Sequence, residues 1–226
     1  MIVHNVIQGE NNWHELRAKY PTASEAPAML GLSKYQSRND LLKQKATGIT
    51  PDVSPTMQAI FDEGHAAEAR ARPIAEAIIG SELFPCTATD DGAQYLASFD
   101  GIDMLETICW EHKGFNQELA DAINQGQVPD THWPQLEQQL FVSGAEKVLF
   151  MCSDGTVENM AHVWYISAPE RRQQVIEGWA QFDKDLASYE HKEAVVAPTG
   201  KAPDALPSLH IEVKGMVTAS NLGLVV

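Results

Sequence analysis

The sequence predicts an α/β domain built on a central mixed sheet of about five strands flanked by helices. Apolar residues recur at helical spacing over roughly residues 10–80, and alternating apolar patterns follow over residues 82–111. Helical and alternating segments then succeed one another to about residue 189, which is the order of an α/β domain. A chain of 226 residues buries enough surface to fold without disulfides or a structural metal.

Capping residues and stop signals mark the expected helices. A short helix begins near Asn12, and Thr22 provides the cap for a second. A long helix over 54–79 is expected to kink or break at Pro73 and to stop at Gly80. The remaining helices are expected at residues 38–47, 115–125, 131–143 and 169–189.

The expected strands are short segments of alternating or continuous apolar residues. A turn containing Asp100 and Gly101 is expected to separate the second strand from the third. The strands are expected at residues 82–89, 93–99, 105–111, 147–152 and 162–166.

Composition divides the chain into residues 1–190, one folded domain, and residues 191–226, a Pro/Ala-rich linker with a strand-like tail over Leu209 to Thr218. Three cysteines without CxxC spacing indicate neither a disulfide framework nor a zinc site. No signal peptide or membrane-spanning run is recognisable, so we expect a cytoplasmic protein that does not bind membranes.

The net charge of −15 argues against a protein that coats nucleic acid nonspecifically, because polyanions repel each other. A negative net charge is nevertheless compatible with a groove that is locally basic. Residues 34–48 carry Lys34, Arg38, Lys43 and Lys45 against Asp40, a net of 4 − 1 = +3. We therefore expect charge segregation, with these basic residues lining a channel.

A group of charged residues around the third expected strand indicates chemistry. Glu111 and Lys113 are two apart on a strand, so they share a face, and Asp100 ends the preceding strand beside them. Two converging carboxylates favour a cation between them, and oxygen ligands suit Mg²⁺, with Mn²⁺ as a substitute. Metal-assisted phosphodiester hydrolysis fits this group.

The Glu-x-Lys pattern alone is weak, because it also occurs at Glu190/Lys192 and Glu212/Lys214. The pair at 190 ends a helix, where residues two apart do not share a face. The pair at 212 has no acidic partner held on a neighbouring strand. Chance spacing in an acidic chain therefore stays an alternative for the pair at Glu111 when it is taken by itself.

Asp100, Glu111-His112-Lys113 and Gln135 resemble the signature of the PD-(D/E)xK nucleases. More narrowly, the chain resembles the YqaJ-type viral recombinases, the phage lambda type of alkaline exonuclease, from about residue 10 to 190. It departs from the usual pattern at Phe99, where Pro is common. The further motifs that carry this resemblance are Trp13–Arg17, Thr22–Glu25, Gly64-x-x-x-Glu68 and Ser98–Gly101.

The resemblance implies roles for individual residues of the metal site. Asp100, Glu111 and the backbone carbonyl of His112 would bind one or two Mg²⁺ ions, and Glu68 would join them directly or through water. Lys113 would handle the nucleophilic water. Gln135 would orient that water or the lysine. A surface acid on an amphipathic helix is the alternative interpretation of Glu68.

The resemblance also implies a pocket for a 5′-terminal phosphate. Arg17, Ser24 and Ser98 would form it, Lys34 would add positive charge, and Trp13 would stack on the terminal base pair. The alternatives are a core position for Trp13 and a surface ion pair for Arg17.

Three functional hypotheses follow. The first is a Mg²⁺-dependent 5′→3′ exonuclease that digests one strand of linear duplex DNA from a 5′-phosphorylated end to mononucleotides. By resemblance it is encoded by a phage or prophage, works in the bacterial cytoplasm, forms a homotrimeric ring and leaves 3′ single strands for an annealing recombinase. The second is a PD-(D/E)xK endonuclease of restriction or repair type, and the third a non-catalytic recombination adaptor.

Overall fold

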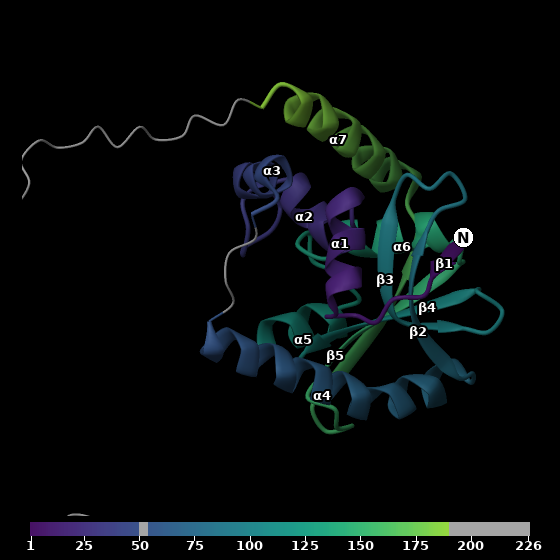
Figure 1. The fold of residues 1–226 in the computed structure, drawn as a ribbon. Helices are drawn as coiled ribbons and strands as arrows, with labels where there is room; N and C mark the ends of the chain where they lie inside the picture. The colour runs from purple at the N-terminus through teal and green to yellow at the C-terminus, as the bar shows by residue number, and fades with distance from the viewer. Residues whose placement is uncertain (50–53, 190–226) are drawn as a thin grey trace, which may run out of the picture. The chain divides into compact units, whose positions relative to one another are not determined.

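The computed structural model describes residues 1–49 and 54–189, which form an α/β domain around a six-stranded sheet (Figure 1). The strands follow chain order from β1 at one edge to β6 at the other. Neighbours are antiparallel except β4 and β5, which are parallel, so the predicted mixed sheet is confirmed with one additional strand. The strands are β1 (Ile2–His4), β2 (Leu83–Thr89), β3 (Leu96–Asp103), β4 (Ile108–Gly114), β5 (Lys147–Ser153) and β6 (Met160–Ile166).

Different helices cover the two faces of the sheet (Figure 1). The long helix α4 (Pro55–Ile79) lies on one face, where small residues such as Ala71 and Ala75 pack with Trp110 of β4. On the other face α6 (Trp133–Ser143) and α7 (Pro169–Ala187) form the larger core. The other helices are α1 (Asn11–Lys19), the 3₁₀ helix η1 (Ala23–Glu25), α2 (Ala26–Met29), α3 (Arg38–Thr47) and α5 (Gln117–Asn124).

The parallel pairing of β4 and β5 determines what lies over the site. Parallel neighbours need a crossover connection, because a tight turn only joins antiparallel strands. Here α5 and α6 make that crossover. It brings α6 across the sheet face next to β3 and β4, so polar side chains of α6 reach the strand residues singled out in the sequence.

The predicted turn at Asp100 and Gly101 is wrong, because both residues lie inside β3. The chain reverses after Asp103 instead. The Asp103 carboxylate accepts hydrogen bonds from the backbone N–H groups of Thr107 (2.7 Å) and Ile108 (2.8 Å). An aspartate that binds the following backbone in this way builds its own turn, and this signal outweighs the Asp-Gly pair.

Gly101 serves packing rather than a turn. A Cβ atom at this position would lie 2.9 Å from the Cβ of Leu83 and 3.2 Å from the Trp110 ring. Only glycine lets β3 approach these neighbours so closely.

Two further expectations differ from the structure. The helix α4 continues through Pro73 without a break and ends at Gly80, whose φ is +80°. β1 was not expected, because its three residues, Ile2–His4, are too few to show an alternating pattern; pairing with β2 forms it.

The predicted linker and strand-like tail of residues 191–226 lie outside the described residues. Within residues 1–49 and 54–189, no helix combines the length and the apolar character needed to cross a membrane.

Candidate active site

Asp100 and Glu111 come together where the pairing of β3 with β4 ends. The last recorded pair there joins Gly101 and Trp110. One residue further, Oδ2 of Asp100 accepts a hydrogen bond from the backbone N–H of His112 at 2.7 Å. The aspartate side chain thus satisfies the strand amide and lies directly beside Glu111, as the sequence predicted, but it is held by a strand rather than by a turn.

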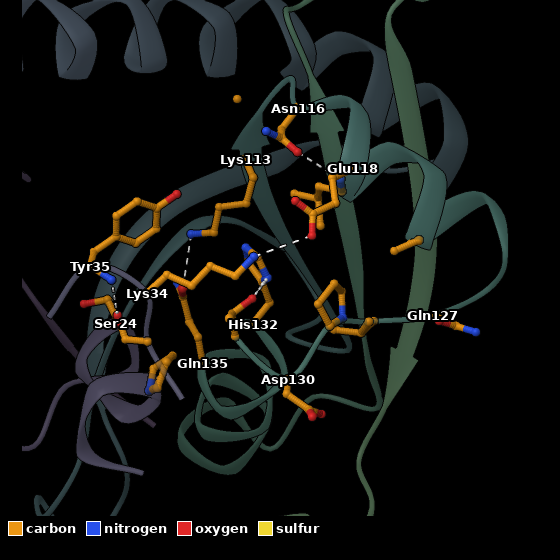
Figure 2. Close-up of a pocket in the computed structure, with 18 residues that line it drawn as sticks. Ser24, Lys34, Tyr35, Lys113, Asn116, Glu118, Gln127, Asp130, His132 and Gln135 are labelled. Carbon is orange, nitrogen blue, oxygen red and sulfur yellow. Dashed lines mark hydrogen bonds and ion pairs between the residues drawn. The ribbon is translucent and has the colours of Figure 1, made fainter. Parts of the chain in front are cut away.

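Glu111, Lys113 and Gln135 form one hydrogen-bonded group. Nζ of Lys113 donates to Oε1 of Glu111 at 2.6 Å and to Oε1 of Gln135 at 3.1 Å. The amide Nε2 of Gln135 donates to the same Glu111 oxygen at 2.7 Å. The predicted shared face of Glu111 and Lys113 is therefore confirmed, and α6 brings Gln135 onto that face (Figure 2).

Glu68 reaches the same group from α4, on the other side of the strands. Its Oε1 lies 3.1 Å from Nη2 of Arg72, one helical turn further along. The pKa of Glu68 is raised on balance. Burial has the largest effect, the charges of Arg72 and His65 oppose it, and the charge of Glu111 adds to it. Glu68 is thus partly buried and close enough to Glu111 to feel its charge, rather than a free surface acid.

The side chain of His112 points away from the carboxylates. Its Nε2 lies 2.9 Å from the hydroxyl of Ser153, and its ring lies against Trp110. Burial, with the charge of Lys113, lowers the pKa of His112 to about 4, so the ring is neutral at pH 7. Only the backbone of His112 faces the site, and its carbonyl stays a predicted metal ligand.

The charges of this site conflict with one another. Burial raises the pKa of Asp100 well above its usual value, and the neighbouring Glu111 and Glu68 raise it further. Burial alone would lower the pKa of Lys113, but Glu111 and Asp100 outweigh it, so the pKa is raised and the ammonium keeps its proton. Lys113, together with Arg72 beside Glu68, supplies two positive charges for three carboxylates, so a divalent cation would relieve the remaining repulsion.

The donor set fits Mg²⁺, which prefers oxygen ligands and usually binds proteins through one or two carboxylates while keeping water ligands. Asp100 and Glu111 would be those carboxylates. Among the residues described, no three Asp, Glu, His or Cys side chains are placed to hold a metal ion together.

The residues predicted to bind a 5′-phosphate are connected as well. Nη2 of Arg17 donates to the Ser24 hydroxyl at 3.0 Å, and the guanidinium lies 4.5 Å from the centre of the Trp13 ring. The indole of Trp13 donates to the Ser98 hydroxyl at 3.0 Å. Trp13 is only partly buried, so a core position is excluded. These four residues link α1 and η1 to β3.

Lys34 lies apart from the Arg17 group. It faces Glu118 of α5, with 3.6 Å between Nζ and Oε1, across a groove of about 930 Å³ (Figure 2). Ser24 and Lys113 line the same groove, and so does Gln135. Lys34 therefore lies in the groove that Lys113 and Gln135 also line, and it forms an exposed ion pair with Glu118.

The expectation that residues 34–48 provide a free basic channel needs correction. Arg38 is 2.5 Å from Asp185 of α7, and Lys34 pairs with Glu118. Lys45 is largely buried and binds the carboxylate of Glu25 at 2.9 Å. Three of the four basic side chains are thus paired with acids, and Lys34 is the one among them that lines the groove.

Two residues at this site were missed from the sequence. Lys45 also donates to the backbone carbonyls of Arg17 (2.9 Å) and Tyr20 (3.0 Å), so it anchors the end of α1 beside the Arg17 pocket. Gln139 binds Glu111 from α6. Its position four residues after Gln135 places both on one helix face, a signal that the sequence did contain.

Solved structures similar to this one include an alkaline exonuclease. LHK-Exo from Laribacter hongkongensis has a TM-score of 0.62 at 19% identity, covering 79% of this chain and 95% of its own. Its complex with dAMP has a TM-score of 0.65 at 18% identity, covering 79% and 93%. A phage-related exonuclease from Haemophilus somnus has a TM-score of 0.56 at 10% identity, covering 78% and 97%. At such identities the likeness shows the fold, which is of PD-(D/E)xK type.

None of the curated proteins compared with the chain matches it significantly. The profile of the YqaJ-like viral recombinase domain matches residues 12–146, more than half of the 226 residues. The match includes α1 with Trp13, both site strands and all of α6. The chain therefore belongs to the YqaJ-like viral recombinase family.

Proposed function

We propose that this protein is a Mg²⁺-dependent 5′→3′ exonuclease, which digests one strand of linear duplex DNA from a 5′-phosphorylated end to mononucleotides. The observation that carries the proposal is the chain of contacts from Arg17 through Trp13 to Ser98, on the strand that also holds Asp100. A pocket for a terminal phosphate beside a metal-binding carboxylate is what an enzyme acting on ends requires. Membership of the family and the alkaline exonuclease fold support the same function.

Each side chain has a role in this proposal. Arg17, Ser24 and Ser98 hold the terminal phosphate, and Trp13 stacks against the terminal base pair. Lys113, kept protonated by Glu111, donates hydrogen bonds to the attacking water or the scissile phosphate, while Gln135 fixes the lysine. Mg²⁺ bound by Asp100, Glu111 and the His112 carbonyl, with Glu68 beside it, would supply an activated water and neutralise phosphate charge.

The biological setting is part of the proposal. The product, a duplex with a 3′ single strand, is the substrate of a single-strand annealing protein, which would be the partner in phage-type recombination. Assembly into a homotrimeric ring and action in the bacterial cytoplasm remain predictions from the family resemblance.

The two alternatives give different results in one assay. A blunt linear duplex with or without a 5′ phosphate and a closed circular duplex are incubated with Mg²⁺ and the protein. Release of mononucleotides from the phosphorylated linear duplex, with the circle intact, is expected. Cleavage of the circle would favour the endonuclease. A complete lack of hydrolysis, equal to that of a Lys113→Ala variant, would leave the non-catalytic adaptor.

A further inference from the structure

A second glutamine of α6, Gln139, holds the other oxygen of Glu111. Its Nε2 donates to Oε2 of Glu111 at 2.5 Å and to the backbone carbonyl of Ser98 at 3.2 Å. The side chain is completely buried. It therefore joins the carboxylate on β4 to the backbone of β3, two residues before Asp100.

The two oxygens of Glu111 have different partners. Oε1 accepts from Lys113 and Gln135, both of which border the open groove. Oε2 accepts from Gln139, in the interior. Because Glu111 is itself buried, the bond from Gln139 is the one recorded restraint on Oε2, and together with the bonds to Oε1 it fixes the carboxylate plane.

The cost of this arrangement is visible at Gln139 itself. Its Oε1 is buried and has no hydrogen-bond partner among the described residues. An unpaired buried acceptor is unfavourable, because it has lost its hydrogen bonds to water without gaining others. Exchanging the two ends of the amide would point this oxygen at the Glu111 carboxylate, so the observed orientation is the favourable one.

The preceding residue, Gln138, offers a contrast. It is equally buried, but its Nε2 donates to the carbonyls of Pro21 (3.0 Å) and Leu96 (3.1 Å), and its Oε1 accepts from Trp179 (2.7 Å). All its polar atoms are satisfied, and none of these contacts involves a site carboxylate. Gln138 thus stabilises the fold, whereas the main contact of Gln139 is with a proposed metal ligand.

We propose that Gln139 is a positioning residue, which holds Glu111 in the orientation that binds the divalent metal. This inference rests on the metal dependence in the proposed function. Hydrogen-bond partners of ligating carboxylates fix the ligand, and their removal typically lowers metal affinity or activity about 10- to 100-fold.

The test compares Gln139→Met with Gln138→Met in the full chain. Methionine keeps the length of the side chain and removes the amide. Mn²⁺ is titrated calorimetrically into each protein without DNA. The dissociation constant of Gln139→Met is expected to rise about 10- to 100-fold, and that of Gln138→Met to stay at the wild-type value. The midpoint of thermal unfolding should fall further in Gln138→Met, and saturating Mg²⁺ should restore nuclease activity to Gln139→Met.

An unchanged Mn²⁺ affinity in folded Gln139→Met would overturn the inference. If that variant does not fold, Gln139→Asn, whose amide is one methylene shorter, is judged by the same criterion. Wild type that binds Mn²⁺ but releases no nucleotides would overturn the proposed function and leave the role of Gln139 testable by affinity. Wild type that binds no Mn²⁺ would overturn both.

Discussion

The indole N–H of Trp13 lies 3.0 Å from the hydroxyl of Ser98, so α1 is bound to the strand that carries Asp100. Ser98 and Asp100 are two residues apart on β3. Side chains at this spacing point to the same face about 6.6 Å apart. The strand itself, and not a loop, therefore sets the distance between Ser98, one of the residues proposed to bind the terminal phosphate, and the carboxylates. A fixed distance of this kind is the physical basis for expecting products of uniform length.

Arg17→Ala is expected to lower kcat/KM on a 5′-phosphorylated duplex roughly 10- to 100-fold, because hydrogen bonds to charged groups contribute about 1.5–3 kcal/mol. The rate on a 5′-hydroxyl duplex should not change. Lys19→Ala removes an equal charge from the same turn of α1 and is the control. Both rates are measured by nucleotide release. An unaltered preference for the phosphate in Arg17→Ala would mean that the pocket is assigned wrongly.

Asp100→Asn is expected to raise the midpoint of thermal unfolding in EDTA, because it removes one of three carboxylates that repel each other. The same change should abolish the stabilisation that Mg²⁺ gives the wild type, since binding to the folded state alone produces that gain. Calorimetric scans with EDTA and with Mg²⁺ measure both effects. Glu146→Gln, an exposed change, should behave like the wild type. A full Mg²⁺ response in Asp100→Asn would exclude Asp100 as a ligand.

His132 is expected to make stability fall in mild acid. Burial, with the charges of Lys113 and Lys34, lowers its pKa to about 4. The unfolded chain takes up this proton near pH 6.5 and the folded protein only near 4, so the stability is complete above 6.5 and declines as the pH falls through that window. The loss from pH 7 to pH 5 is about 2 kcal/mol for one such histidine.

His132→Gln should remove this part of the loss, measured by urea unfolding at the two pH values in EDTA. His112 has a similarly low pKa and remains in the variant, so a residual decline is expected. If variant and wild type lose the same free energy of unfolding, His132 is not buried in its neutral form.

Glu137→Ala is expected to destabilise the fold by about 1–3 kcal/mol, because it leaves the buried hydroxyl of Tyr165 without its acceptor, whereas Arg172 is partly exposed and can be hydrated. The Glu137 carboxylate is completely buried and accepts from the Tyr165 hydroxyl (2.6 Å), Nε of Arg172 (3.1 Å) and the backbone N–H of Ala168 (3.2 Å). Urea unfolding with Glu158→Ala, an exposed acid, as the control measures the difference. A loss below about 1 kcal/mol, typical of exposed pairs, would contradict the buried network.

Periodicity predicted most of this fold because hydrophobic patterns report which face of an element is buried. The helix over 38–47 and the strand that begins at Lys147 were found in this way. Positions decided by a single side chain were missed, as at Asp103, whose carboxylate moves the turn away from Gly101. Local sequence does not reveal such a bond before the chain is folded.

At the site, too, some contacts were predictable from local spacing and others were not. Alternation along β4 was enough to put Glu111 beside Lys113. The pairing of Lys45 with Glu25 depends on tertiary contacts between α3 and η1, so counting charges along the chain did not show that this lysine is held by an acid. Local spacing predicts contacts within an element, whereas contacts between distant elements need the fold.

The helix α6 leaves little freedom for sequence change. Nine of its eleven residues are buried, and Gln135, Glu137, Gln138 and Gln139 each make side-chain hydrogen bonds to other elements. An ordinary surface helix has a solvent-facing stripe where substitutions are nearly neutral. Here only Gln135 and Phe141 are not buried, and Gln135 belongs to the site. In a saturation library of this segment, variation should survive mainly at Phe141, so attempts to alter specificity are better directed at the loops around the groove.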